Sequence, residues 1–151
     1  MRIGVPKEIK AQESRVGLTP DSVKVLISNG HEVLVENNSG FEAGFDNDQY
    51  KKSGAKIVSQ ALDIFNDSEI IVKVKEPLNN EIKMIKENQI VFTYLHLAAA
   101  KELTEGLIKS KSVCIAYETV TDSNGKLPLL APMSAVAGRM SIQAGAHSLQ
   151  K

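Results

Sequence analysis

The chain has 151 residues, 42% of them hydrophobic, and its 18 Lys and Arg residues balance 18 Asp and Glu residues. That length suits one domain, or one domain and part of another, and the balanced charge lacks the basic excess of a nucleic-acid-binding protein. No apolar run reaches the roughly 20 residues of a membrane span. Residues 1–8 lack the apolar core of a secretion signal, and a single cysteine makes no disulfide framework. We therefore expect a cytoplasmic globular protein without a nucleic-acid or membrane partner.

Short apolar or β-branched segments alternate with helical patterns along the chain. In chain order, we expect strands at 2–5, 31–36, 55–58, 70–74, 90–95 and 112–117. We expect helices between them from Thr19 to Gly30, at 46–53, from a cap at Ser59 to near 66, at 80–87 and at 98–110. A last helix is expected from Pro132 to Lys151. This alternation predicts an α/β fold. The expected architecture is an open, mostly parallel sheet flanked by helices, Rossmann-like or flavodoxin-like, that ends in a long helix.

Two helices carry further signals: the first has a clear N-terminal cap, and the last has a distinctive stripe of residues along one face. Thr19-Pro20-Asp21 places a capping Thr, a Pro at the first helical position and an Asp in the first turn. The last helix carries an apolar and small-residue stripe without a later partner in the sequence, which indicates an interrupted chain. The stripe consists of Ala135, Gly138, Ile142, Gly145 and Leu149.

Polar residues follow three of the expected strands, where open parallel sheets bind their ligands. Arg15 lies in the loop after the first strand, Lys75 follows the strand at 70–74, and His96 directly follows the strand at 90–95. If these strands are neighbours, two cations and an imidazole meet at one edge of the sheet. Arg binds carboxylates bidentately, and His exchanges protons near neutral pH. The three residues predict a site for a small carboxylate whose reaction needs a proton partner.

Each candidate also has a structural interpretation. Arg15 can be a solvated loop residue or the ion-pair partner of Glu13. Lys73 competes with Lys75 from the same strand face, and either can be a surface residue. His96 can be a capping or core residue. No His or Cys lies at metal-ligand spacing from His96, so we expect no metal. The sequence also lacks G-x-S-x-G, phosphate-loop and G-x-G-x-x-G patterns.

Several motifs, in order and spread over the whole chain, carry a family resemblance. They are Lys7-Glu8, Glu13-x-Arg15-Val16-x-x-Thr19-Pro20, Lys73-Val74-Lys75-Glu76-Pro77, Tyr94-Leu95-His96-Leu97-Ala98-Ala99, Ala116-Tyr117-Glu118-Thr119-Val120, Leu127-Pro128-Leu129-Leu130-Ala131-Pro132-Met133-Ser134 and Ala137-Gly138-Arg139. The opening resembles the superfamily of alanine dehydrogenases and proton-translocating nicotinamide nucleotide transhydrogenases. The Lys75 and His96 motifs narrow the resemblance to alanine dehydrogenase.

The resemblance implies reversible, NAD-dependent oxidative deamination of L-alanine to pyruvate and ammonia. It implies that Arg15 and Lys75 bind the substrate, that His96 is the catalytic acid and base, and that Ser134 contacts NAD. It places the second catalytic acid and the Gly-rich loop in a cofactor domain that this chain does not contain, and it implies a homohexamer for full-length members. We accordingly expect residues 1–128 to form the N-terminal substrate-binding domain and residues 129–151 to begin an interdomain helix.

Three hypotheses therefore stand. The first is the substrate-binding N-terminal domain of an alanine dehydrogenase, inactive when isolated. The second is a non-catalytic truncated assembly or binding module that docks through its last helix. The third is the first domain of a proton-translocating transhydrogenase subunit, against which the Lys75 and His96 motifs weigh.

Overall fold

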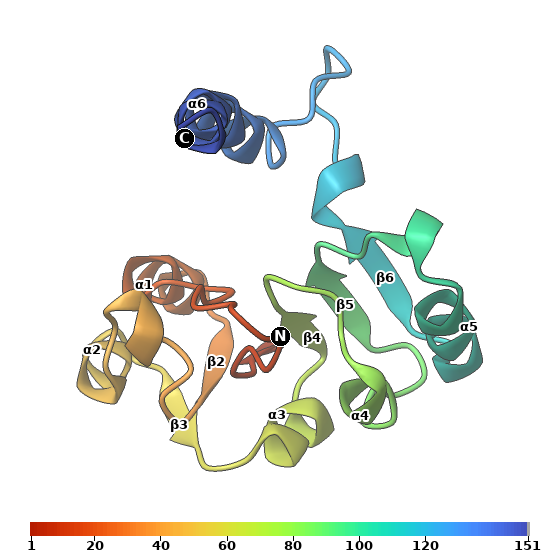
Figure 1. Ribbon diagram of the computed structural model, residues 1–151. Helices are drawn as coiled ribbons and strands as arrows, with labels where there is room; N and C mark the ends of the chain where they lie inside the picture. Colours follow the sequence, from red (N-terminus) through yellow and green to blue (C-terminus); the bar gives the residue numbers. More distant parts are fainter. Residues whose placement is uncertain (151) are drawn as a thin grey trace. The chain divides into compact units, whose positions relative to one another are not determined.

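The computed structural model describes residues 1–150, which belong to two compact units, Met1–Ile115 and Ala116–Lys151 (Figure 1). The strands and α-helices that begin in the first unit are β1 (Arg2–Val5), α1 (Pro20–Ser28), β2 (Glu32–Glu36), α2 (Asn47–Lys52), β3 (Lys56–Val58), α3 (Ala61–Asp67), β4 (Ile70–Val72), α4 (Asn79–Ile82), β5 (Ile90–Thr93), α5 (Lys101–Ser110) and β6 (Val113–Ala116), whose last residue lies in the second unit. The second unit contains α6 (Ala131–Ser148).

The six strands form one open sheet in the order β3-β2-β1-β4-β5-β6. The pairings of β1 with β2 and β4, of β2 with β3, and of β4 with β5 are all parallel. The chain runs outward from β1 to β3, crosses back, and then runs outward again from β4 to β6. The order reverses between β1 and β4, which is the switch point where doubly wound sheets bind ligands. The predicted α/β fold class is confirmed.

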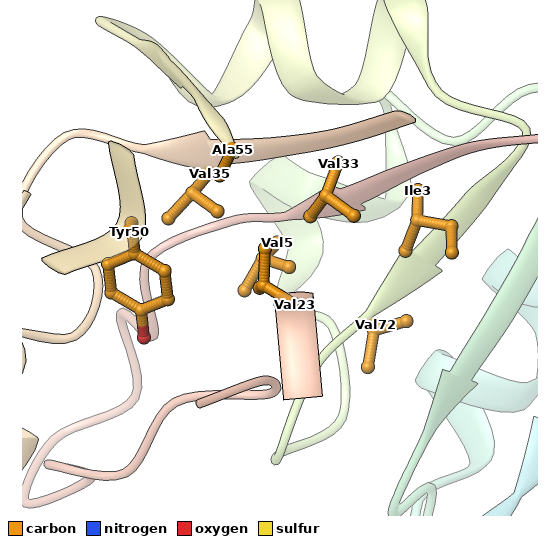
Figure 2. Close-up of a cluster of buried hydrophobic side chains, with 8 residues drawn as sticks. All are labelled: Ile3, Val5, Val23, Val33, Val35, Tyr50, Ala55 and Val72. Atoms are coloured by element: carbon orange, nitrogen blue, oxygen red, sulfur yellow. The ribbon is translucent and has the colours of Figure 1, made fainter. Parts of the chain in front are cut away.

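The core shows why β1 has its sequence. Ile3 and Val5 lie in one apolar cluster with Val23 of α1 and Tyr50 of α2 (Figure 2). Gly4 faces the opposite side, where an added Cβ would lie 2.7 Å from Ile64 Cγ2 of α3. The alternation therefore places α1 and α2 on one face of β1 and α3 on the other. Burial raises the pKa of Tyr50 to about 12, and its hydroxyl donates a hydrogen bond to a loop carbonyl at 2.8 Å.

Several predicted boundaries are confirmed and others are wrong. Thr19 caps α1 as expected, because its side chain accepts the Ser22 N–H. Ser59 is not the cap of α3, since the N-cap position falls on Gln60. The helix expected at 80–87 is only the four-residue α4.

The second unit contains a turn and one long helix. In the turn, Asp122 N–H donates to Lys126 C=O at 2.9 Å and Gly125 N–H donates to Asp122 C=O at 3.0 Å, with Gly125 at φ +73°. The predicted last helix is confirmed as α6, which has 18 residues and Pro132 in its first turn. No helix in the described part of the chain is long and apolar enough to cross a membrane.

Candidate active site

The parallel sheet brings the carboxyl ends of β1, β4 and β5 together at one edge. Arg15 lies in the loop after β1, Lys75 three residues after the end of β4, and His96 three residues after the end of β5. Because β4 lies between β1 and β5, the three segments follow neighbouring strands. Two of them, those of Arg15 and Lys75, flank the switch point.

Glycine brings the Arg15 loop close to β4. A Cβ added to Gly17 would lie only 2.5 Å from the carbonyl oxygen of Val72, the last residue of β4. A side chain at this position would therefore collide with backbone, which cannot move aside as a flexible side chain does. The loop can follow this path only with glycine at position 17.

Glu13 orients the guanidinium of Arg15. Arg15 Nε donates to Glu13 Oε1 at 2.8 Å and Nη2 donates to Oε2 at 2.6 Å, a bidentate pair. Arg15 is the main cause that holds the pKa of Glu13 below its usual value, and the charge of Lys75 adds to the effect. The ion pair of Arg15 with Glu13 is thus present, and Glu13 also lies within electrostatic range of both cations.

The two competing lysines occupy different environments. Lys73 is 1% exposed, and its Nζ lies 2.7 Å from Glu81 Oε1 and 3.3 Å from Glu8 Oε2. Its ammonium is therefore committed to a buried ion-pair network. Lys75 is half-buried, and its carbonyl accepts a hydrogen bond from Thr93 Oγ1 at 2.9 Å. This leaves Lys75 as the lysine that suits a ligand site.

Glu8 connects the loop after β1 to the end of β4. Its Oε1 accepts the Val74 N–H at 2.6 Å and the Lys75 N–H at 3.4 Å. Burial raises the pKa of the Glu8 carboxyl, although the nearby charge of Lys73 opposes the increase. The sequence analysis did not predict this role, for which the only signal was an acidic residue three positions beyond the first strand.

His96 has an unusual backbone conformation. Its φ of 51° and ψ of 38° lie in the left-handed region, which is uncommon for residues other than glycine and is often found at functional sites. The imidazole is stacked on Tyr94 with 6.2 Å between ring centroids. Its Nδ1 lies 3.6 Å from Glu76 Oε2, and 55% of the side chain is exposed. A proton-exchanging group in this position is accessible to a ligand.

Ser134 belongs to the second unit and lies in the first turn of α6, where it is exposed. Within residues 1–150, no three His, Cys, Asp or Glu side chains are grouped so that they could hold a metal ion. The tightly packed glycines in the sheet unit contact protein atoms, as Gly4 and Gly17 do, and build no diphosphate cradle. The packed glycines of the sheet unit therefore do not fit the diphosphate of a dinucleotide.

An open parallel sheet with charged groups beyond the carboxyl ends of its central strands defines the class of doubly wound ligand-binding α/β domains. A family model described as "Alanine dehydrogenase/PNT, N-terminal domain" matches residues 4–137. The chain belongs to this family.

Similar proteins agree with this assignment. The whole chain is 51% identical to an alanine dehydrogenase of Halomonas elongata and 53% identical to one of Staphylococcus epidermidis, and it spans 41% and 40% of their lengths. A solved L-alanine dehydrogenase matches with a TM-score of 0.92 and 53% identity, over 97% of this chain and 40% of that one. A transhydrogenase from Sinorhizobium meliloti matches with a TM-score of 0.77 and 25% identity, over 82% of this chain and 35% of that one.

Proposed function

We propose that this chain is the substrate-binding N-terminal domain of an NAD-dependent alanine dehydrogenase. The reaction is L-alanine plus NAD⁺ and water to pyruvate, ammonium, NADH and a proton, and it is reversible. The observation that carries the proposal is the position of Arg15, Lys75 and His96 after three neighbouring strands in a chain of this family. The identity of about half with alanine dehydrogenases, against 25% with the transhydrogenase, favours this function over the first domain of a transhydrogenase.

Each residue of the proposed site has a role that its chemistry supports. Arg15, whose guanidinium plane Glu13 fixes, binds the substrate carboxylate, and Lys75 polarises the carbonyl oxygen of pyruvate through its positive charge. His96 takes a proton from the attacking water during deamination and returns one to the carbonyl oxygen in the reverse direction. NAD, when bound, supplies the hydride acceptor. We propose that it is held mainly by the part of the relatives that this chain does not match, with Ser134 as a contact.

The assay measures alanine-dependent NADH formation by the full-length protein. We expect His96→Ala to reduce kcat by about 100-fold or more, because a positioned general base contributes about 10²- to 10⁴-fold. We expect Arg15→Ala mainly to raise the KM for alanine and pyruvate. Near-normal kinetics in both variants would contradict the site, and absence of turnover in the wild-type protein would favour the non-catalytic module.

Further properties of the whole protein belong to the same proposal. We propose that the isolated chain is inactive, that the full-length protein is a cytoplasmic homo-oligomer, a hexamer as in its family, and that it acts in L-alanine catabolism. The isolated chain tests the first point directly, since clear turnover without a cofactor domain would contradict it.

A further inference from the structure

Glu76 presents its two carboxylate oxygens to different neighbours. Oε1 accepts a hydrogen bond from the ammonium of Lys10, which lies in the loop after β1. Oε2 is buried and has no hydrogen-bond partner, yet it lies 3.6 Å from His96 Nδ1. A buried acceptor without a donor is costly, and an N–H on the imidazole nitrogen 3.6 Å away is a donor that a small approach would bring into hydrogen-bond range.

The imidazole is restrained in this orientation from two sides. The left-handed backbone at His96 sets the direction in which its side chain leaves the chain, and the ring of Tyr94 is stacked on it at an angle of 30°. Lys10 restrains the carboxylate from the opposite side. Because both side chains are restrained, the local fold itself holds Nδ1 of His96 close to Oε2 of Glu76.

The carboxylate is ionised near neutral pH. Burial raises the pKa of Glu76, but the hydrogen bond from Lys10, the backbone N–H of Glu76 itself and the charges of Lys10 and His96 together bring it below its usual value. An ionised carboxylate only accepts hydrogen bonds. Of the two tautomers of the neutral imidazole, the carboxylate therefore favours the one with its proton on Nδ1, in which the acceptor lone pair is on Nε2.

We propose that Glu76, held by Lys10, is a positioning residue that fixes the tautomer of His96 so that Nε2 is the proton-accepting atom. The assignment of His96 as the catalytic base rests on the proposed function, whereas the tautomer does not. The same division of roles, in which a carboxylate orients a histidine and the histidine exchanges the proton, occurs in Ser-His-Asp triads.

The test is Glu76→Gln in the 151-residue chain, with the tautomer read from the ¹⁵N shifts of the imidazole nitrogens at about pH 9, above the ordinary histidine pKa of about 6.5. Lys10 requires an acceptor and takes the amide oxygen, so the amide NH₂ then faces Nδ1 as a donor. We expect the Nδ1–H form to dominate in the wild type and the Nε2–H form to dominate in the variant. His31 and His147, the other two histidines, act as internal references.

Two further variants keep the test decisive. Glu87→Gln makes the same change in an exposed glutamate that pairs with Lys111 at 3.4 Å. Glu87 precedes β5 and therefore lies at the opposite end of that strand from His96. This control variant should leave the tautomer of His96 unchanged. Lys10→Met removes the anchor without adding a donor and should reduce the Nδ1–H population without inverting it. A tautomer of His96 that is the same in the wild type and Glu76→Gln overturns the proposal.

Activity separates this proposal from the function on which it rests. In the full-length protein, Glu76→Gln should lower kcat about 100-fold, the lower end of a general-base effect, while KM changes less than about threefold. Loss of the wild-type tautomer with unchanged kcat would contradict the role of His96 as the base, and would leave the positioning by Glu76 established.

Discussion

Substituting Lys73 should reduce stability, whereas substituting Lys75, two positions later, should reduce substrate binding. Lys73→Met leaves the carboxylates of Glu8 and Glu81 buried without their cation, and breaking a buried ion pair costs about 3–5 kcal/mol. We expect a loss of about that size in the free energy of unfolding, measured by urea denaturation. Lys75→Met, two positions along the same segment, is the matched control. It should change stability by less than about 1 kcal/mol and reduce substrate binding.

The cost of Lys73→Met should depend on pH. The folded pKa of Glu8 is already raised, so its protonated form stabilises the fold below about pH 4.5, and this stabilisation is lost as the pH rises through the folded pKa. Removing Lys73 raises that pKa further. The destabilisation should therefore be larger at pH 8 than at pH 5, and an equal loss at both values would contradict the buried charge as its cause.

The contribution of Glu13 to stability should depend on pH in the opposite direction. Its folded pKa is lowered, mainly by the hydrogen bond from Arg15, so its stabilising contribution is present above about pH 4.5 and is lost as the pH falls through the folded pKa. We expect Glu13→Gln to cost about 1.5–2 kcal/mol at pH 7, the low end of the range for hydrogen bonds to charged groups, because the Arg15 side chain is half exposed. The difference from the wild type should shrink progressively as the pH falls below about 4.5. A constant difference between the two curves would exclude this ion pair as the origin.

The residues of the proposed site differ in how well the sequence could predict them. Arg15, Lys75 and His96 could be selected because each follows a strand that its own apolar residues predict. The pairing of Glu76 with Lys10 could not, because it joins residues 66 positions apart, and no local pattern encodes such a contact. The left-handed conformation of His96 also has no sequence signal, since it is not a glycine.

At the scale of elements, Gly17 determines how the loop after β1 meets β4. Gly17→Ala places a Cβ 2.5 Å from the Val72 carbonyl, and relieving such overpacking costs about 1–3 kcal/mol. We expect this loss of stability in urea denaturation, together with a raised KM for pyruvate because the loop carries Arg15. Gly145→Ala, with no atom within 4 Å of its added Cβ, is the control and should do neither.

Element types could be predicted better than element ends. The apolar patterns at 70–74 and 90–95 extend beyond the observed ends of β4 and β5, and the backbone there still pairs, since Tyr94 N–H donates to Val74 C=O at 3.2 Å. The short α4 differs for another reason. Glu81 accepts the Leu78 N–H at its N-terminus, and beyond Ile82 the chain continues in tighter turns, with Met84 N–H donating to Glu81 C=O at 2.9 Å and Ile85 N–H to Ile82 C=O at 3.3 Å.

At the scale of the whole molecule, the reversal of strand order explains where the charges gather. Loops that leave β1 and β4 run to opposite sides of the sheet, so their first residues flank a crevice that no crossover helix fills. Arg15 and Lys75 lie on these two segments. The sheet order therefore brings two cations to one edge, although they are 60 residues apart in sequence. Both cations lower the pKa of the Glu13 carboxyl.

The division into two units predicts where stability resides. Every buried residue lies before the unit boundary, and none of the residues 116–150 is buried. Because burial of apolar surface dominates folding stability, a chain that ends at the exposed turn residue Lys126 should keep the core intact. We expect its free energy of unfolding in urea to lie within about 0.5 kcal/mol of the 151-residue chain, the range of changes remote from the core. A loss above about 2 kcal/mol would show that α6 contributes to the stability of the sheet unit.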